Sequence, residues 1–238
     1  NYVGVNRAGD DTSGGIYYYS ISLDHGSSYN VIGTNSDGQG DIAERNLISG
    51  DTYAQIAFFG TGSDYNTVAG NYIGVNALGT EAITDGGVGV QTGPFTAHNV
   101  IGTNGDGNND AFEGNVIAGG WANLLVTGSH HRIAGNYFGV NAAGTAILPS
   151  TNNYQESSLF IGYEDGGHND SPATNIIFGT NGDGISDALE GNVVASTAPI
   201  TLRIAETGTS GTIIAGNLFG VGADKSTILA LSTLIQID

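Results

Sequence analysis

Short segments in which apolar residues alternate with small or polar ones recur along the whole chain. Between residues 71 and 135 these segments are 71–74, 87–91, 98–102, 115–119, 123–127 and 131–135. Alternation with a period of two is typical of a strand with one buried face, and the many glycines disfavour helices. The pattern therefore predicts an all-β protein made of strands of about four residues.

A longer unit repeats along the chain and groups these segments. It begins with the motif N-Y-[VIF]-G-V-N at 1–6, 71–76 and 136–141, and a weaker copy lies at 217–222. These starts divide the chain into repeats 1–70, 71–135 and 136–216 and a partial repeat 217–238. A long repeat that carries several short strands is typical of a solenoid.

The corners between segments indicate how the solenoid is wound. Segment 131–135 passes directly into Asn136, whereas segment 98–102 reaches Asn115 only after a polar loop. We therefore interpret the loop as an insertion at an equivalent corner, so that three strands form one coil and two coils form one repeat. The sequence predicts a single domain, 1–238, of about seven coils with three short strands per coil, stacked into a rod ~30–35 Å long.

The tandem pattern N-x-[IV]-x-G-N-x-[IV], combined with G-[VI]-x-[VI] strands, resembles the right-handed parallel β-helix of pectin-lyase-like proteins. More narrowly, it is similar to the Asn/Gly-rich repeats of large secreted bacterial surface proteins. The resemblance covers essentially the whole chain and implies the fold, but that fold hosts lyases, hydrolases, epimerases and adhesins. Asparagines at the corners are expected to adopt left-handed geometry and to pair their side-chain amides with the next coil. The candidates are Asn46, Asn71, Asn115, Asn136, Asn192 and Asn217.

A twelve-residue stretch, G-T-N-x-D-G-x-x-D-x-x-E, occurs three times, at 33–44, 102–113 and 179–190. Oxygen-bearing residues at positions 3, 5, 9 and 12, with Gly at position 6, match the calcium loop of EF-hands, in which position 7 offers its backbone carbonyl. The predicted Ca²⁺ ligands are Asn35, Asp37, Gln39, Asp41 and Glu44 in the first loop, Asn104, Asp106, Asn108, Asp110 and Glu113 in the second, and Asn181, Asp183, Ile185, Asp187 and Glu190 in the third.

Two features complicate the calcium interpretation. Position 1, which is Asp in an EF-hand, is Gly33, Gly102 or Gly179 here, so a neighbouring coil or water must complete each site. Asp-Gly and Asn-Gly pairs are also ordinary turn formers, and solvated turns remain an alternative. The recurrence of acids at the same offsets favours calcium. Magnesium is disfavoured because it prefers to keep its waters and to take few protein ligands.

The charge of the chain limits its partners. The formal net charge is −18, with five basic residues against 23 acidic ones, which excludes a nucleic-acid-binding surface. No apolar run approaches the roughly 20 residues of a membrane span, so membrane insertion is not expected. The chain has no Met, so we expect it to be a processed product or a piece of a longer protein. Weak calcium loops fill where calcium is at about millimolar level, which favours an extracellular or cell-surface location.

Residues for catalysis are harder to find, and none is assigned. In a lyase of the resembled family an Arg or Lys base would act beside calcium, but Arg203 is expected to point outward alone, and Arg132 lies beside two histidines. The polar groups Glu164–Asp165 and His168–Asp170 match no hydrolase signature. Neighbouring residues on a strand face opposite sides, so His130 and His131 are not expected to share a metal.

The outer face of the middle strands is expected to carry exposed apolar rings. Strict alternation places Ile16, Tyr18, Val88, Val90, Leu159 and Ile161 inside. It places Tyr17, Tyr19, Phe59, Leu125 and Phe160 outside. Such a row indicates a contact surface, which could stack on sugar rings, pack against another chain or lie beneath a loop.

These observations predict a non-catalytic, calcium-stabilised extracellular β-solenoid with a structural or adhesive role, with a self-assembling fibre or filament subunit as one form of it. Its expected partners are other copies of itself or flanking repeats of a longer chain. The alternative is a β-helix protein that binds or cleaves a polysaccharide, with carbohydrate as its ligand.

Overall fold

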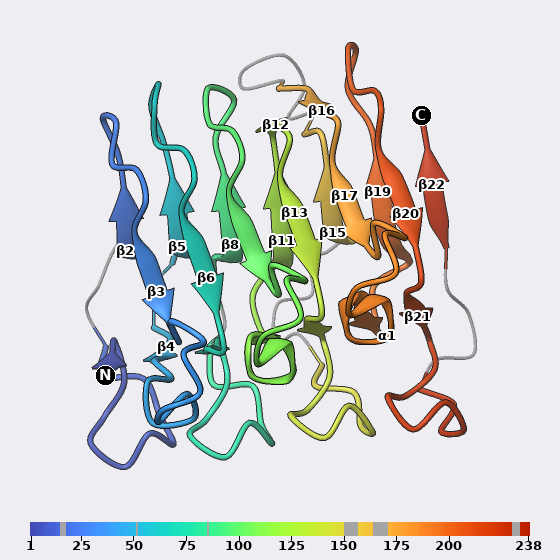
Figure 1. The fold of residues 1–238 in the computed structure, drawn as a ribbon. Coiled ribbons are helices and arrows are strands. Elements are labelled where there is room, and N and C mark those ends of the chain that lie inside the picture. The colour runs from blue at the N-terminus through green and yellow to red at the C-terminus, as the bar shows by residue number, and fades with distance from the viewer. Residues whose placement is uncertain (15–17, 51, 85, 150–156, 164–170, 230–233) are drawn as a thin grey trace.

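The chain winds into a right-handed parallel β-helix, which confirms the predicted fold class (Figure 1). The computed structural model describes residues 1–14, 18–50, 52–84, 86–149, 157–163, 171–229 and 234–238. Two sheets have seven strands and a third has six, and every pairing within them is parallel and joins successive coils. The described residues therefore form about seven coils with three short strands each, as the sequence predicted.

Sheet I contains the shortest strands. They are β1 (Tyr2–Val3), β4 (Leu47–Ile48), β7 (Tyr72–Ile73), β10 (Val116–Ile117), β14 (Tyr137–Phe138), β18 (Val193–Val194) and β21 (Leu218–Phe219). Sheet II contains β2 (Tyr19–Leu23), β5 (Ala54–Phe58), β8 (Val88–Thr92), β11 (Ala122–Val126), β15 (Ser157–Ile161), β19 (Ile200–Ile204) and β22 (Ile235–Ile237).

Sheet III and a few minor elements complete the solenoid. The strands of sheet III are β3 (Val31–Gly33), β6 (Thr67–Ala69), β9 (Val100–Gly102), β13 (Arg132–Ala134), β17 (Ile177–Gly179) and β20 (Ile213–Ala215). A two-stranded sheet joins β12 (Gly128–Ser129) to β16 (Ala173–Thr174). The described helices are single turns, η1 (Asp110–Phe112) and α1 (Asp187–Glu190).

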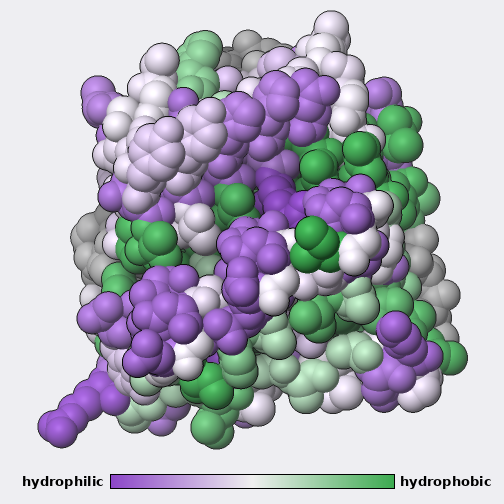
Figure 2. All heavy atoms as spheres, in the orientation of Figure 1, coloured by the Kyte–Doolittle hydropathy of each residue, from purple (hydrophilic) through white to green (hydrophobic). Residues whose placement is uncertain are grey.

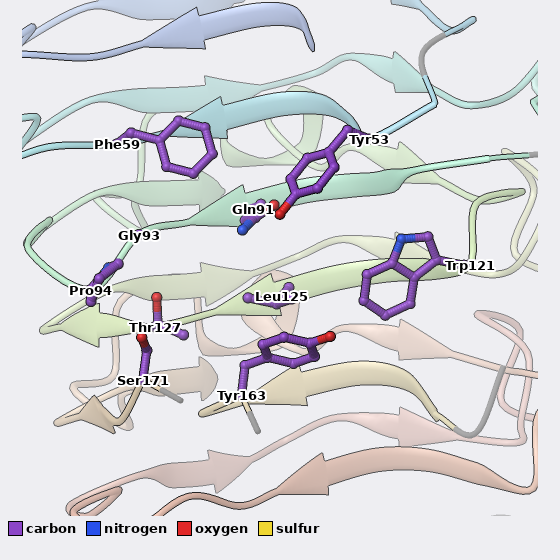
Figure 3. Close-up of a pocket in the computed structure, with 10 residues that line it drawn as sticks. All are labelled: Tyr53, Phe59, Gln91, Gly93, Pro94, Trp121, Leu125, Thr127, Tyr163 and Ser171. Carbon is purple, nitrogen blue, oxygen red and sulfur yellow. The ribbon is translucent and has the colours of Figure 1, made fainter. Parts of the chain in front are cut away.

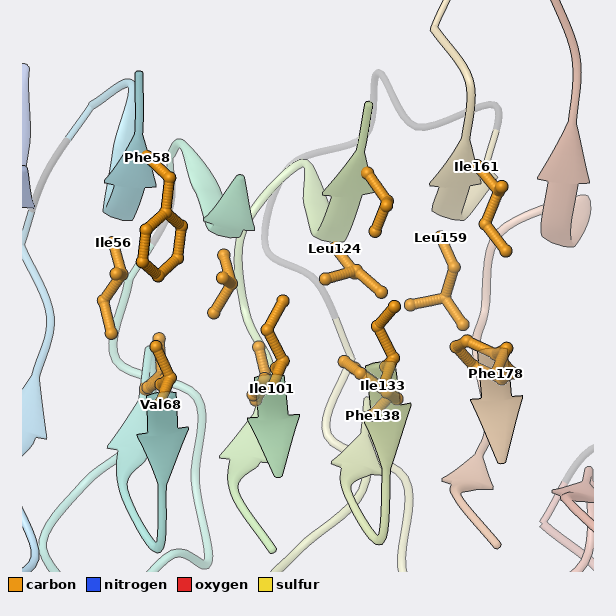
Figure 4. Packing of buried hydrophobic residues seen from close by; sticks show 14 of the residues in the cluster. Ile56, Phe58, Val68, Ile101, Leu124, Ile133, Phe138, Leu159, Ile161 and Phe178 are labelled. Carbon is orange, nitrogen blue, oxygen red and sulfur yellow. The ribbon is translucent and has the colours of Figure 1, made fainter. Parts of the chain in front are cut away.

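The hydrophobic core fills the space between the three sheets. Figure 4 shows Leu124 and Leu159 of sheet II pointing toward Ile133 and Phe178 of sheet III. Val90, Leu159 and Ile161 lie in this core, as predicted. Each coil adds a few side chains at the same place in the cross-section, and they stack on those of the next coil. The central core is therefore one continuous column.

Strict alternation fails at the start of the sheet II strands. Val88 packs with Ala54 and Ala122 in a second cluster outside the central core, and Tyr18 is 67% exposed, so both predictions of an inward side chain are wrong. Ala54 belongs to the outer cluster although Ile56, two residues later, belongs to the central core, so the alternation shifts by one residue at Gln55. Tyr19, Phe59, Leu125 and Phe160 belong to the outer cluster as predicted, whereas residues 16 and 17 lie outside the described part.

A ladder of seven asparagines runs along the corner where sheet I begins. In each coil the side-chain Nδ2 donates a hydrogen bond to the Oδ1 of the Asn in the next coil, at 2.8–3.1 Å. The same Oδ1 also accepts the backbone N–H of the preceding Asn, as Asn136 does from Asn115. The ladder consists of Asn1, Asn46, Asn71, Asn115, Asn136, Asn192 and Asn217. The predicted amide pairing is therefore confirmed.

The left-handed geometry that was predicted for these asparagines is found instead at the preceding glycine, in the coils that turn this corner without a loop. Gly70 and Gly135 have φ of +72° and +70°, whereas the ladder asparagines do not have positive φ. Asn175 has φ of +54° and lies at the corner position of His130, not at the following position held by Asn99. Ile176 takes that ladder position, so the third repeat has no extra residue there.

A shorter ladder at the corner before sheet III ends in a buried histidine. Asn30 pairs with Asn66, and Asn66 pairs with Asn99, through their side-chain amides. The backbone N–H of Asn99 then donates to Nδ1 of His131 at 3.1 Å, which leaves the Nε2–H to donate to the Thr127 carbonyl at 3.1 Å. Burial lowers the pKa of His131 to about 4, so the ring is neutral in the folded protein at pH 7.

We expect Asn136→Ala to lower the free energy of unfolding by about 2–5 kcal/mol, because several buried groups lose their partners and each costs about 1–3 kcal/mol. Asn136 donates to Asn192 and to the Ile101 carbonyl and accepts from Asn115. Urea unfolding followed by circular dichroism measures the change. Asn217→Ala, at the half-buried end of the ladder, is the control and should cost less. Equal losses in the two variants would show that the buried ladder has no special weight.

The stability of the protein should depend on pH through His131. The pKa is about 6.5 in the unfolded chain and about 4 in the folded one, so the unfolded state binds the extra proton and stability falls as pH drops from 6.5 to 4. His131→Asn, which places the residue of the earlier coils in the ladder, should remove that part of the pH slope of the urea midpoint. The exposed His25→Asn is the matched control and should keep the slope. An unchanged slope in His131→Asn would contradict the assignment.

Candidate calcium-loop row

The three twelve-residue loops leave the solenoid at the same corner, between sheet III and sheet I. They follow β3, β9 and β17 and precede β4, β10 and β18, so they occur once every two coils (Figure 1). In the alternate coils the same corner is turned by Gly70, Gly135 or Gly216 alone, between the last residue of the strand and the ladder Asn. The loops are therefore insertions at an equivalent corner, as the sequence comparison predicted.

The loops share one internal hydrogen-bond pattern. In the third loop the backbone N–H of Asn181 donates to Glu190 Oε2 at 3.0 Å, and the N–H of Ile185 donates to Asp183 Oδ1 at 2.8 Å. The Asn181 side chain donates to Asp183, and the N–H of Gly184 donates to Asp187 at 3.1 Å. The first and second loops repeat each of these four bonds at the same positions. The three loops therefore adopt the same local conformation.

Glycine at position 1 is required by the neighbouring coil. Gly33 has φ of +112°, and a Cβ on it would overlap the carbonyl oxygen of Ala69. Gly102 and Gly179 meet Ala134 and Ala215 in the same way. An Asp at this position, as in an EF-hand, has no room for its side chain, so this corner excludes the first EF-hand ligand sterically.

Threonine at position 2 is a site residue that the ligand pattern did not include. The hydroxyls of Thr34, Thr103 and Thr180 accept a backbone N–H two residues further on, at 2.9–3.0 Å. In the first and third loops this hydroxyl also donates to the position 9 carboxylate, as Thr180 does to Asp187 at 2.9 Å. The invariance of Thr in all three copies of the motif was the available signal.

Several carboxylates of the loops are buried. Asp41, Asp110, Glu113 and Glu190 are at most 6% exposed. In the third loop one oxygen each of Asp183, Asp187 and Glu190 lie within 4.8 Å of one another. In the second loop Oδ1 of Asp110 is buried and has no hydrogen-bond partner among the described residues, and burial raises the pKa of Glu113. This negative charge is held away from water without full compensation.

The other predicted ligands lie at the rim of the loops. The side chains of Asn35, Asp37, Asn104, Asp106, Asn181 and Asp183 are exposed, as are those of the three position 7 residues, Gln39, Asn108 and Ile185. Glu44 and Asp187 are half-buried. Each loop therefore has a buried or half-buried floor formed by positions 9 and 12 and an exposed rim formed by positions 3, 5 and 7.

The loops form a continuous row along one edge of the solenoid. Ser36 of the first loop donates to the Asn108 carbonyl, and Asn109 of the second loop donates back to the Ser36 carbonyl. The second loop contacts the third, because Gly105 packs against Glu190. Figure 2, in the same orientation, shows this face as hydrophilic surface interrupted by hydrophobic patches. The row itself exposes Ile42, Phe112, Ile185 and Leu189.

The third loop differs from the others through a basic residue of the intervening coil. Nη2 of Arg132 on β13 lies 2.6 Å from Oε1 of Glu190, and their side chains are 13% and 0% exposed. The register of sheet III places Thr67 at the corresponding position one repeat earlier, so Glu113 of the second loop has no equivalent partner. Arg132 does contact the second loop, because its Nε donates to the Thr103 carbonyl at 3.1 Å. Sequence reasoning missed this ion pair because only the register of sheet III brings Arg132 to the third loop.

The residues considered for catalysis do not assemble into a site among the described residues. Arg203 points outward, as predicted, but is not alone, because its Nε donates to Asp238 at 2.8 Å. His130 stacks on His98 at the surface while His131 is buried, so the two adjacent histidines face apart as predicted. Residues 164, 165, 168 and 170 lie outside the described part.

Comparison with protein-family models, with curated proteins and with solved structures found no match for this chain. The repeated motifs and the structure are therefore the basis for any functional conclusion. Among the described residues, no helix has both the length and the apolar character needed to cross a membrane.

Arg132→Gln should lower the free energy of unfolding in chelator-treated buffer by about 3–5 kcal/mol, because it leaves the carboxylate of Glu190 buried without its partner. Urea unfolding measures this change, and we expect the dependence of the free energy on urea concentration to be the same in the variant and the parent. The double variant Arg132→Gln, Glu190→Gln should recover much of the loss, since no lone charge remains. If the single and double variants are equally unstable, the ion pair is not the cause.

Proposed function

We propose that this protein is a calcium-stabilised, non-catalytic β-solenoid that serves as an extracellular structural or adhesive scaffold. The observation that carries the proposal is the buried Oδ1 of Asp110, which has no hydrogen-bond partner among the described residues and lies in a loop that also buries Glu113. A buried carboxylate oxygen without a donor is costly, and a cation with oxygen coordination would compensate it. The EF-hand-like spacing, repeated three times, supports calcium as that cation.

The three loops would not bind calcium equally. Arg132 neutralises Glu190 in the third loop, and a guanidinium beside the ligand cage opposes a divalent cation. Glu113 of the second loop has no described basic partner, and its burial already favours the neutral form. We therefore propose that the second loop binds more tightly than the third. Water or a backbone carbonyl would take the place of the first EF-hand ligand in each loop.

The scaffold role agrees with where the loops lie. They touch one another along a single edge, so bound calcium would remove repulsion between the carboxylates of successive loops and hold alternate coils together. The similarity to pectin-lyase-like β-helices and to secreted surface repeats, the location outside the cell and assembly with other copies or flanking repeats remain part of this proposal.

Calcium should raise the thermal midpoint of unfolding, and a chelator should lower it. Sites with dissociation constants of about 0.1–1 mM would each contribute about 1–2 kcal/mol at 5 mM calcium. Scanning calorimetry with calcium, with magnesium at the same concentration and with chelator at matched ionic strength measures the effect. We expect the response to magnesium to be much smaller.

A loop variant and a matched surface variant separate calcium binding from general screening of charge. Asp106→Asn combined with Asp110→Asn should abolish binding to the second loop in isothermal titration calorimetry and reduce the calcium-dependent shift. Asp224→Asn, which removes an exposed carboxylate outside the loops, should leave the shift unchanged. A midpoint that is the same in calcium and in chelator would overturn the proposal.

A further inference from the structure

A groove lies on the outer face of sheet II, away from the loop corner. It has a volume of about 340 Å³ and is formed by residues of the second to fifth coils (Figure 3). Tyr53, Phe59, Trp121 and Tyr163 contribute its aromatic rings, and Gln91 and Leu125 contribute to its floor. Gln91 is paired with Ala57 on one neighbouring strand and with Leu125 on the other. The small side chain of Ala57 leaves room above the strands beside Gln91.

The aromatic rings are held in place by one another. Trp121 lies 5.9 Å from Phe160 and 6.2 Å from Tyr163, measured between ring centroids. Tyr53 meets Tyr19 edge-on at 5.5 Å, and Tyr19 also contacts Phe59 at 5.0 Å. Rings that are already packed lose little conformational entropy when a ligand stacks on them. The two sides of the groove are therefore pre-organised aromatic surfaces.

The floor between these rings carries an unused hydrogen-bond acceptor. Oε1 of Gln91 is inaccessible to bulk solvent and has no hydrogen-bond partner among the described residues. None of the described lining residues has an ionised side chain at neutral pH, although the molecule as a whole carries a formal charge of −18. The described lining residues thus form an uncharged, largely aromatic surface on a strongly acidic protein.

We propose that this groove binds a neutral oligosaccharide. The C–H face of a sugar ring is apolar and packs on an aromatic ring, while its hydroxyls can donate to phenol oxygens at the rim of the groove. A uronate polymer would find no cation here and would be repelled by the acidic surface. The groove crosses three strand spacings, ~14 Å, which suits several linked sugars better than one.

The described lining residues include no carboxylate, imidazole or amine, which supports binding without cleavage. The inference goes beyond the scaffold role and does not depend on calcium, because the loops occupy the corner between the two sheets that the groove does not use. Binding should therefore persist in chelator at temperatures where the fold is intact, even if the calcium proposal fails.

The chain contains a single tryptophan, and it lines the groove, so its fluorescence reports directly on occupancy. The experiment titrates the protein with gluco-, manno-, xylo- and galacto-oligosaccharides of four to six residues, with oligogalacturonate as the charged comparator. We expect at least one neutral series to shift the Trp121 emission in a saturable way at up to millimolar concentration, and oligogalacturonate to have no effect.

Variants test whether the groove is responsible. Trp121→Ala, measured by calorimetry, and Tyr53→Ala, measured by fluorescence, should each weaken binding about tenfold or more. Tyr29→Ala, which removes an exposed ring at the corner before sheet III, should bind as the parent does. Circular dichroism checks that each variant is folded.

Three outcomes would overturn the proposal. They are no saturable response to any neutral series, a response to oligogalacturonate alone, and neutral-sugar binding that survives Trp121→Ala unchanged. A fluorescence shift that follows protein concentration in the absence of sugar would identify a second copy of the chain as the occupant instead.

Discussion

Every part of this solenoid depends on hydrogen bonds between one coil and the next. Parallel strands alone would tolerate a slip in register, since their backbone pattern repeats along the strand. The asparagine ladder removes that freedom, because each Oδ1 accepts both the backbone N–H and the Nδ2–H of the preceding coil. A slipped coil would bury these amides without partners, which costs about 1–3 kcal/mol for each group. The ladder therefore fixes the register of each coil on the next, and with it the position of every other side chain along the strands.

The stacking of coils at the ladder also determines where a loop can be inserted and which ligand residues that loop can contain. The corner before the ladder is fixed only at its ends, by a glycine on sheet III and by the ladder Asn, so a loop can grow outward between them. The glycine at the first end must approach the next coil closely, as Gly33 approaches the Ala69 carbonyl. A loop inserted at this corner must begin with glycine, so it cannot have the Asp that provides the first ligand of an EF-hand. Its acids at positions 9 and 12, by contrast, are drawn into the solenoid edge and buried.

Much of the fold could be predicted from the sequence because its signals repeat. A period of two and a recurring Asn determine coil number and corner type without any knowledge of long-range contacts. One error came from local irregularity, since Gln55 lies between Ala54 of the outer cluster and Ile56 of the central core and breaks the alternation. The Arg132–Glu190 pair was out of reach, because only the register of sheet III brings those residues together.

The loop row and the groove are separated in the cross-section but share the stacking of coils. Trp121 and Tyr53 come from different coils, and the distance between them is set by the height of each coil and by no direct bond between the two rings. Any interaction that prevents coils from sliding or separating therefore also fixes the spacing of the aromatic rings. Contacts between loops two coils apart also resist such movement. They do so whether the charge of the loop acids is compensated by Arg132 or by a bound metal ion. Rigidity along the stack would therefore keep this shallow aromatic surface in the arrangement that the proposed ligand requires.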